Sequence, residues 1–452
     1  MTSARRIAFD ILVSLEQSNQ TLDAKIEERQ KAIDELTRKD RALLHALVYG
    51  VQRWRLRLDW IIDHFSDRPG KKTMPAVHSA LRMGLFQLCF MDRIPPSAAV
   101  NTSVDLIKNS RERWAAGFVN AVLRRAAAGV QNPLPEMQAN TAEAVSIRHA
   151  FPIWIIQRWL DRFGPEETEA LCHAINTIPA ITLRTNTLRT TREALMTEIE
   201  SQAAAASPTP FSPEGVSILA PKSPMTSWPA YRAGWFQVQD EAAQLIGHLL
   251  APAPDQQAWD ACAGLGTKTI HIAQLMENRG NVVATDHRRD KLESLTKEAS
   301  RLGIGIIETR ALDLSKTLPP GLPDDFDRIL VDAPCSGLGV LKKNPDGKWR
   351  VQPEDLKRNR KMQSSLLANA ARRLKPAGIL VYSVCSVEPE ETVDVIEGFL
   401  QIHRDFAIAP HSFSDVKIDS RLISAQGYLC TLPHRHAMDG FFAAALERRP
   451  LR

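Results

Sequence analysis

The chain has no run of about 18 or more apolar residues, although 44% of its 452 residues are hydrophobic. A helix that spans a bilayer needs about 20 such residues, so we expect no membrane segment. The N-terminus, Met-Thr-Ser-Ala-Arg-Arg, leads directly into a helical pattern. It lacks the apolar core and the cleavage site of a signal peptide. We therefore expect a cytoplasmic protein.

Cysteine is scarce, and its positions do not form the close pairs of a zinc site. The two histidines of His434-x-His436 also lack cysteine or acidic partners at ligand spacing, so we predict no bound metal. Scattered thiols are typical of a reducing compartment, where they remain available for chemistry. The six cysteines are Cys89, Cys172, Cys262, Cys335, Cys385 and Cys430.

The chain also lacks a strong excess of one charge, since its net charge is only +5. Binding to nucleic acid would therefore depend on local basic patches. One patch, at residues 342–350, includes Trp349, and such a mixture suits phosphate contacts and base stacking. A solvated surface is the alternative interpretation of such charge runs. The candidate RNA-binding residues are Lys342, Lys343, Lys348, Arg350, Arg124 and Arg125.

The length of the chain favours about three domains. Residues 1–130 show helical spacing of apolar residues, as at Ile7, Ile11 and Leu15. Residues 131–235 begin with a linker around Asn132-Pro133 and suggest a small mixed α/β domain. Within it we expect helices at 153–163 and 165–178, a strand at 181–189 and a flexible loop at 203–212. Residues 236–452 form the third predicted domain.

The third domain alternates strands and helices, which predicts a doubly wound α/β sheet of the Rossmann type. Expected strands include residues 257–260, 281–286, 329–331 and 378–384. The first strand opens into a glycine loop, Gly264-x-Gly266, and aspartates end several strands. Carboxylates at strand ends suit the hydroxyl groups of a nucleoside. The loop lacks the third glycine of the dinucleotide motif, and a strand-end aspartate can also cap the next helix.

Two cysteines follow strands in similar settings, Asp332-Ala-Pro-Cys335 and Tyr382-Ser-Val-Cys385. Ligands bind beyond the carboxyl ends of the strands in an open α/β sheet, so we expect both thiols to face one crevice. The alternative is that each is a small buried apolar side chain.

These motifs resemble the catalytic domain of S-adenosylmethionine-dependent RNA cytosine-5 methyltransferases. Asp439-Gly-Phe-Phe442 is similar to the closing strand of that family. The N-terminal residues Arg41–Gly50 and Gly117–Arg125 resemble the RNA-binding antitermination factor NusB. The order of a NusB-like domain followed by this catalytic domain resembles the branch of the family that acts on bacterial small-subunit ribosomal RNA, often named Sun or RsmB.

The resemblance implies roles for individual residues. Cys385 is the nucleophile, Cys335 assists product release, and Asp332 and Lys268 contact the base. Sequence alone leaves the two thiols interchangeable, because DNA cytosine-5 methyltransferases keep their nucleophile in a Pro-Cys turn. Thr267 places a β-branched side chain where the family has a glycine that permits positive φ, and Leu265 replaces a proline. We still expect the cofactor to bind. The implied cofactor-binding residues are Cys262, Ala263, Gly264, Leu265, Gly266, Thr267, Lys268, Asp286, Asp313 and Asp332.

The resemblance implies that the protein transfers a methyl group from S-adenosylmethionine to C5 of a cytosine in 16S ribosomal RNA. The transfer would pass through a covalent bond between cysteine and C6. We expect a monomer that acts on RNA before the small subunit is fully assembled. The alternative is a non-catalytic RNA-binding factor with a decayed methyltransferase fold. An exocyclic amino methyltransferase is disfavoured, because Ala-Pro-Cys stands where that class has Asp/Asn-Pro-Pro-aromatic.

Overall fold

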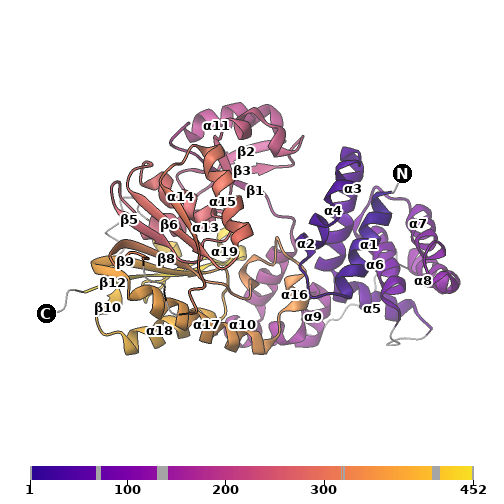
Figure 1. Cartoon of the computed structure of the whole chain (residues 1–452). Coiled ribbons are helices and arrows are strands. Elements are labelled where there is room, and N and C mark those ends of the chain that lie inside the picture. The colour runs from indigo at the N-terminus through magenta and orange to yellow at the C-terminus, as the bar shows by residue number, and fades with distance from the viewer. Residues whose placement is uncertain are drawn as a thin grey trace. The chain divides into compact units, whose positions relative to one another are not determined.

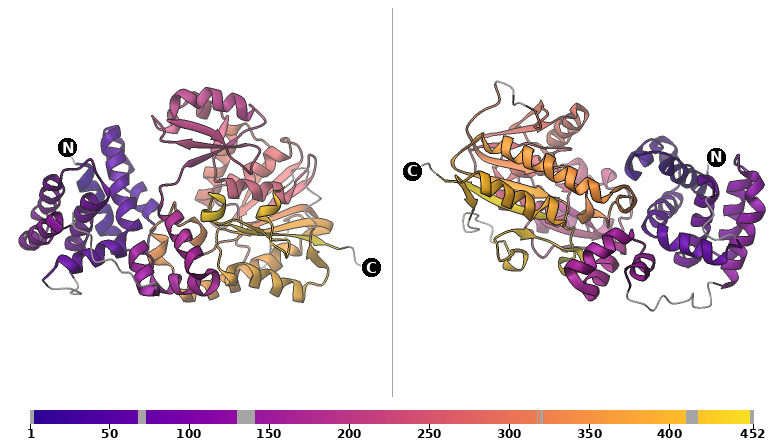
Figure 2. Two further views of the ribbon diagram at one scale, coloured as in Figure 1. Left: turned by 180° about the vertical axis from the view of Figure 1, so that it is seen from behind. Right: turned by 90° about the horizontal axis from the view of Figure 1, so that it is seen from below.

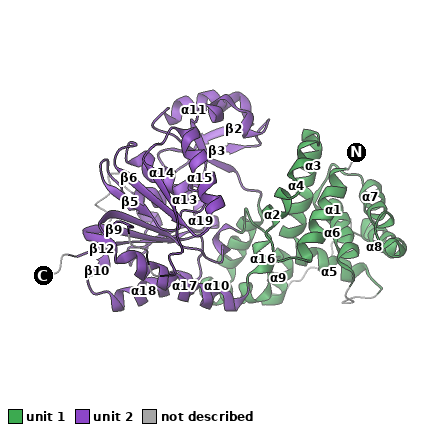
Figure 3. Cartoon of the chain, in the orientation of Figure 1, with its two compact units in different colours: residues 1–177, 341–351 green, residues 178–340, 352–452 purple. Residues whose placement is uncertain are grey.

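The structure is a computed structural model that describes residues 3–67, 73–129, 141–316, 318, 321–409 and 418–449. The chain divides into two compact units, coloured separately in Figure 3. Unit 1 comprises Met1–Thr177 and Leu341–Val351, and unit 2 comprises Ile178–Val340 and Gln352–Arg452. The predicted linker around Asn132-Pro133 lies outside the described residues. The three predicted domain ranges remain predictions.

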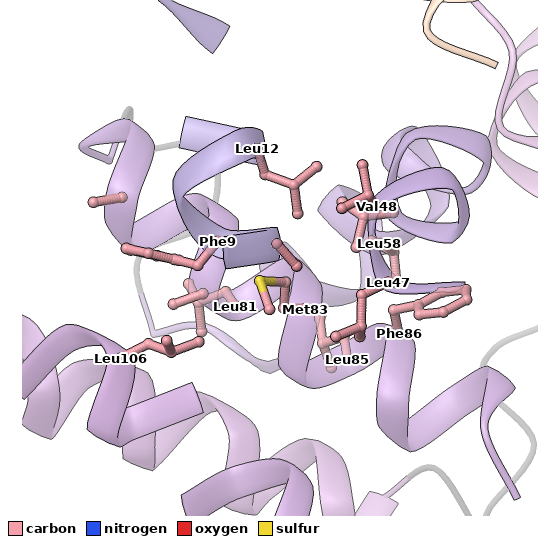
Figure 4. Packing of buried hydrophobic residues seen from close by; sticks show 14 of the residues in the cluster. Phe9, Leu12, Leu47, Val48, Leu58, Leu81, Met83, Leu85, Phe86 and Leu106 are labelled. Atoms are coloured by element: carbon pink, nitrogen blue, oxygen red, sulfur yellow. The ribbon is translucent and has the colours of Figure 1, made fainter. Parts of the chain in front are cut away.

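The N-terminal part of unit 1 is helical, as predicted. Ser3, Thr21 and Thr37 cap three helices, each accepting a hydrogen bond from the backbone amide three residues later. The apolar faces of the helices meet in one core, shown around Leu47 and Phe86 in Figure 4. The helices are α1 (Ala4–Glu16), α2 (Leu22–Glu27), α3 (Gln30–Asp34), α4 (Arg38–Arg53), α5 (Arg55–Phe65), α6 (Pro75–Phe90), α7 (Pro96–Lys108), the 3-10 helix η1 (Arg113–Ala115) and α8 (Ala116–Gly129).

Unit 1 also contains two later helices and a segment from the middle of the chain. Helix α9 spans Ala142–His149, and α10 spans Ile153–Asn176 with a kink at Gly164, where φ is +77°. The kink confirms the predicted break before Pro165. Helix α16 (Gly347–Arg350) lies in the segment Leu341–Val351. No helix in the described ranges is long and apolar enough to cross a membrane.

Unit 2 begins with a four-stranded antiparallel sheet of order β2-β3-β1-β4. The prediction of a flexible loop at 203–212 is wrong in part, because Ala205–Pro208 forms the edge strand β2. Alanine, serine and proline are weak strand formers, so this strand depends on its pairing with β3. The other elements are β1 (Ile181–Thr185), β3 (Gly215–Leu219), β4 (Phe236–Val238), α11 (Arg192–Ile199), η2 (Glu200–Gln202), η3 (Met225–Ser227) and α12 (Pro229–Arg232).

The larger sheet of unit 2 confirms the predicted doubly wound fold. Its order is β10-β12-β9-β8-β5-β6-β7, with β11 beside β12. Strands β5 to β9 run parallel, and β12 runs antiparallel to β9. The strands are β5 (Gln257–Asp260), β6 (Asn281–Asp286), β7 (Ile307–Ala311), β8 (Phe326–Asp332), β9 (Leu374–Val384), β10 (Phe406–Ile408), β11 (Leu429–Cys430) and β12 (Phe442–Arg448).

Helices cover both faces of this sheet, which explains its nearly continuous apolar strands. Helices α13 (Glu241–Leu250), α14 (Thr267–Leu275) and α15 (Arg289–Leu302) pack on one face. Helices α17 (Pro353–Ala371) and α18 (Val393–Ile402) pack on the other face, as Figures 1 and 2 show. The short helices are η4 (Leu338–Val340), η5 (Pro389–Glu391), η7 (Ser420–Leu422) and α19 (Pro433–His436).

Candidate active site

The strand order of the large sheet reverses at β5. From β5 the chain continues to β6 on one side, and β8 lies on the other. Such a reversal of strand order is where open α/β sheets bind ligands, at the carboxyl ends of the strands. The loop after β5 and the two cysteine loops after β8 and β9 all lie at that edge. The topology therefore brings together the residues that the sequence places at strand ends.

The loop after β5 is a tight turn built on two glycines. Gly264 has φ +55° and Gly266 has φ +82°, conformations that cost little for glycine alone. A Cβ atom on Gly266 would lie 2.2 Å from Cγ of Leu295, so a larger residue does not fit there. Thr267 is the first residue of α14 and has no need of positive φ. The β-branched side chain of Thr267 is therefore compatible with the backbone conformation at this position. Leu265, which replaces the proline, is 59% exposed.

Two predicted ribose and adenine contacts, Asp286 and Asp313, also stabilise their own loops. Asp286 is buried, and its carboxylate accepts hydrogen bonds from the amides of Gly264 (3.0 Å) and Arg288 (2.8 Å). Asp313 accepts hydrogen bonds from the amide and the hydroxyl of Ser315. Each carboxylate oxygen has two lone pairs, so these bonds orient the acids without using up their acceptor capacity. Their contacts with a cofactor remain predictions.

Lys268 and Asp332 form an ion pair at the end of β8, the strand that precedes the Cys335 loop. Lys268 Nζ lies 2.7 Å from Asp332 Oδ2, and the Ser383 hydroxyl donates to Asp332 Oδ1 at 2.7 Å. Burial is the largest influence and would lower the pKa of Lys268, but the charge and hydrogen bond of Asp332, together with the charges of Cys385 and Asp260, outweigh it and the pKa is raised. Lys268 is therefore an ammonium group, and its charge also acts on Cys385.

The two predicted catalytic thiols meet, as the strand-end pattern predicted. Asp332 of β8 and Ser383 of β9 are register partners, so the loops that follow these residues begin side by side. Cys335 Sγ lies 3.3 Å from Cys385 Sγ. The hydrogen bond with Cys385, together with burial, raises the pKa of the Cys335 thiol. Cys335 is therefore held as the protonated partner of the pair.

Backbone contacts lock the Cys385 loop to two neighbouring loops. Gly339 N donates to the Cys385 carbonyl oxygen at 3.0 Å, and Gly440 N donates to the Gly339 carbonyl oxygen at 2.8 Å. A Cβ atom on Gly339 would lie 1.9 Å from the oxygen of Gly440. The close approach requires glycine at position 339, which gives this glycine a packing role.

Glu391 is a site residue that sequence reasoning did not identify as such. Its position in Pro389–Glu391 predicts only the start of a helix, where acids oppose the helix dipole. The structure buries Glu391 fully and directs its carboxylate at both cysteine loops. No local pattern indicates this, because the hydrogen-bond donors lie up to 55 residues away in sequence.

The basic segment 342–350 does not present all its predicted RNA contacts. Lys348 is fully buried, and its Nζ donates to the carbonyl oxygens of Arg53 and Ala150 and to Asn176 Oδ1. Trp349 donates from Nε1 to the Gln52 carbonyl oxygen at 2.8 Å. The prediction that Lys348 contacts phosphates is therefore wrong, while base stacking by the half-buried Trp349 remains a prediction. Both side chains anchor the segment within unit 1.

The remaining basic candidates lie nearer the surface. Lys342 and Lys343 are half-buried, and Arg350 is exposed and pairs with Asp346 at 2.9 Å. On α8, Arg124 lines a surface hollow, and the exposed Arg125 forms an ion pair with Asp67. Their RNA contacts remain predictions. The residues concerned are Lys342, Lys343, Arg350, Arg124 and Arg125.

One group of possible metal ligands occurs among the described residues, away from the histidine pair considered above. Glu214, His248 and His271 are buried, with ligand atoms within 4.8 Å of one another. Glu214 and His248 already pair, with Nε2 2.8 Å from Oε2. Burial and then the charge of Arg184 lower the pKa of His271, which is therefore neutral. The arrangement is a buried pair beside a neutral ring, and neither ring nitrogen of His271 has a hydrogen-bond partner among the described residues. The absence of a metal remains a prediction.

Comparison with known proteins extends over the whole chain. Three family models match: NusB family at residues 2–128, a ferredoxin-like domain of RsmF/B-like methyltransferases at 151–224, and 16S rRNA methyltransferase RsmB/F at 247–447. The chain is 35% identical to a "Probable ribosomal RNA small subunit methyltransferase B" of Synechocystis, over 99% of this chain and 100% of the relative. A Bacillus subtilis protein described in the same words is 32% identical over 99% of both chains.

One solved structure is similar to this chain over nearly its whole length. The structure described as PH0851 covers 98% of this chain and 98% of its own, with a TM-score of 0.81 and 26% sequence identity. The match includes the helical part and both sheets, since nearly the whole chain is aligned.

Proposed function

Because this chain belongs to the 16S rRNA methyltransferase RsmB/F family, we propose that it methylates C5 of a cytosine in 16S ribosomal RNA through a covalent bond between Cys385 and C6. The family establishes an rRNA methyltransferase, and the choice of atom and the covalent step are our proposal. The observation that supports both is the pair of thiols 3.3 Å apart at the ends of two adjacent parallel strands.

The chemistry of cytosine explains why a thiol is needed. C5 of cytosine is a poor nucleophile until another nucleophile adds to C6. The Cys385 thiolate would form the bond to C6, leaving electron density on C5, which then takes the methyl group. The C5 proton must then leave, and the bond between sulfur and C6 must break to restore the ring. Adding and removing the thiolate divides one difficult step into easier ones.

The second thiol suits the release step. Cys335 lies within hydrogen-bond distance of Cys385 and keeps its own proton, because its pKa is raised. A thiol in this position donates a hydrogen bond to the sulfur of Cys385 as that sulfur leaves C6, which assists the expulsion of the thiolate, while the C5 proton passes to solvent. The Lys268 ammonium stabilises the negative charge that Cys385 carries before attack and after release.

Asp332 would orient the target cytosine. Asp332 is held by Lys268 and Ser383, both at 2.7 Å, so its carboxylate has a defined direction. A carboxylate there accepts a hydrogen bond from N4 or from a protonated N3 of cytosine. The target base must leave its stack to reach these groups, so an unpaired or open region of RNA is the expected substrate.

S-adenosylmethionine would supply the methyl group, and the residues around the glycine turn fit such a ligand. The turn at Gly264 and Gly266 leaves open space at Gly264, where a Cβ atom would meet nothing within 4 Å. Asp286 and Asp313 end or follow neighbouring strands and offer carboxylate oxygens to ribose hydroxyl groups and the adenine edge.

Bisulfite sequencing of 16S ribosomal RNA from cells with and without this protein tests the proposal. One cytosine should be protected from conversion only when the protein is present. Protection that survives in the absence of the protein would refute the assignment. An unmethylated RNA together with retained RNA binding would instead favour the non-catalytic alternative.

A further inference from the structure

We propose that Glu391 is a positioning residue that ties the two cysteine loops together and sets the separation of the Cys335 and Cys385 thiols. The inference deepens the proposed function, because it concerns the two residues that carry the covalent chemistry there. Glu391 itself lies in the 3-10 helix η5. Within the described ranges its carboxylate accepts hydrogen bonds from the serines that follow the two cysteines and from helix α17, and from neither sulfur.

The carboxylate of Glu391 bridges the residues that directly follow the two cysteines. Ser336 donates to it twice, from its amide to Oε1 at 2.7 Å and from its hydroxyl to Oε2 at 2.5 Å. Ser386 donates from its hydroxyl to the same Oε2 at 2.5 Å. One carboxylate oxygen therefore connects the Cys335 loop to the Cys385 loop, one residue beyond each thiol.

Helix α17 completes the bridge. Asn359 donates from Nδ2 to Glu391 Oε1 at 2.8 Å. Gln363 lies at the edge of hydrogen-bond distance, 3.5 Å from Oε1, and donates to the Pro334 carbonyl oxygen at 2.9 Å. The backbone of η5 is fixed as well, because the Tyr382 hydroxyl donates to the Glu391 carbonyl oxygen at 2.7 Å. Glu391 therefore links η5, α17, β9 and both cysteine loops.

The carboxylate of Glu391 is buried away from water, so it depends on these hydrogen bonds. Glu391 is 0% exposed, and among the described residues no lysine or arginine forms an ion pair with it. A carboxylate buried without such a partner is tolerated only when hydrogen bonds satisfy it, and here neutral donors from three elements do so. The loss of the carboxylate would leave those donors unpaired and release the two loops from each other.

Two substitutions separate position from charge. Glu391→Ala removes every side-chain hydrogen bond. Glu391→Gln keeps them when its oxygen faces Ser336 N and Asn359, because its amide can donate to the hydroxyl oxygens of Ser336 and Ser386. Glu390→Ala is the matched control, since Glu390 is the half-buried neighbour in the same 3-10 helix.

The first readout does not depend on methylation. Diamide joins two close thiols in a disulfide while its N=N bond takes up the two hydrogens, and peptide mapping identifies the Cys335–Cys385 bond. We expect Glu391→Ala to lower the rate of this reaction at least tenfold. Glu391→Gln and Glu390→Ala should react at the rate of the unmodified protein.

The second readout concerns the reaction itself. The kcat for methylation of ribosomal RNA by Glu391→Ala should fall about 10²-fold with little change in KM, because a misplacement of about 1 Å has that effect. Circular dichroism and thermal melting establish whether the variant is folded. If it is not, Ser386→Ala removes one arm of the bridge, and a slower disulfide reaction is again expected.

A folded Glu391→Ala protein that forms the disulfide at the unmodified rate would overturn the inference. Glu391→Gln as slow as Glu391→Ala would overturn it too, because the hydrogen bonds would then not be what matters. If the unmodified protein produces no 5-methylcytosine, the proposed function fails, while the disulfide measurement still decides the role of Glu391.

Discussion

Lys268 Nζ lies 2.7 Å from Asp332 Oδ2, which joins the first turn of α14 to the end of β8, the strand that precedes Cys335. Both side chains are largely buried, at 10% and 29% exposure. Each charge is therefore stabilised mainly by the other, and neither side chain is expected to tolerate loss of its partner. Asp332 is three residues before Cys335, and Lys268 interacts electrostatically with Cys385, so the integrity of the pair should matter for the reaction as well as for folding.

A double-mutant cycle should detect this coupling. Lys268→Met leaves the Asp332 charge without its partner and should destabilise unit 2 more than the same change made in an Asp332→Asn background. The expected coupling is about 1–3 kcal/mol, the upper part of the range for residues in contact. Chemical denaturation of the four proteins measures it, and additive effects would show that the pair contributes no coupling.

Asp286→Ala should weaken the binding of S-adenosylmethionine. The change removes the oriented carboxylate beside Gly264, and with it the hydrogen bonds expected to ribose hydroxyl groups. The loss should be about 1–3 kcal/mol, measured by calorimetry. Asp290→Ala is the control, because Asp290 lies four residues later on the exposed surface, paired with Arg288. Equal affinities for Asp286→Ala and the unmodified protein would exclude Asp286 as a cofactor contact.

The salt dependence of RNA binding should distinguish the lysines of the segment 342–350. Replacement of Lys342 and Lys343 by glutamine should reduce the slope of log K against log[salt] by about 0.7–0.9 for each phosphate that the protein no longer neutralises. Lys348→Met should leave that slope unchanged, because Lys348 is fully buried. It should instead lower the stability of unit 1 by about 1–3 kcal/mol, since three oxygen atoms lose their donor. A slope changed only by Lys348→Met would contradict this assignment.

The sequence predicted the central sheet well because its signals are local. Gln257–Asp260 and Asn281–Asp286 form strands with the predicted bounds, and the Ala-Pro-Cys335 turn follows its strand as expected. Apolar runs that end at an acid or a turn specify such elements without knowledge of their partners. The meeting of Cys335 and Cys385 followed from the parallel order of the strands.

The features that sequence could not predict all depend on distant partners. The strand Ala205–Pro208 exists because β3 pairs with it. Lys348 is buried because oxygen atoms of Arg53, Ala150 and Asn176 accept hydrogen bonds from its Nζ, while its local sequence resembles a solvated basic run. No residue spacing indicates such contacts, so charge alone led to the wrong placement for Lys348.

The stability of the protein should depend on pH through Asp260. Burial, and to a lesser extent the charge of Asp332, raises the pKa of Asp260 to about 7. The unfolded chain loses this proton near pH 4, while the folded chain keeps it until about pH 7. The contribution of Asp260 to stability therefore falls as pH rises from about 4 to about 7, and it is constant above that.

Asp260→Asn should remove this dependence. Its unfolding free energy, relative to the unmodified protein, should rise by about 2–3 kcal/mol between pH 5 and pH 8, at 1.36 kcal/mol per pKa unit. Denaturation at several pH values measures the difference, and Thr269→Val is a useful control because it removes only the hydroxyl donor to Asp260. A difference that does not vary with pH would mean that Asp260 ionises normally.

The two thiols should give opposite results when each is removed. Cys385→Ala should abolish methyl transfer and form no covalent RNA complex, because it lacks the group that bonds to C6. Cys335→Ala should still attack and methylate but release its product slowly, because the neighbouring proton donor 3.3 Å away is gone. It should therefore accumulate protein joined to RNA, visible as a slow band on a denaturing gel.

The order of the steps makes this test decisive. A residue needed only for release leaves the earlier steps intact, so its loss traps their product, whereas loss of the nucleophile leaves nothing to trap. An adduct in Cys385→Ala alone would make Cys335 the nucleophile, with the roles of the two strand ends exchanged. Cys430→Ala is the control, because Cys430 lies on β11 and takes no part in the pair. If neither Cys335→Ala nor Cys385→Ala reduces methylation, the covalent mechanism is wrong for this protein.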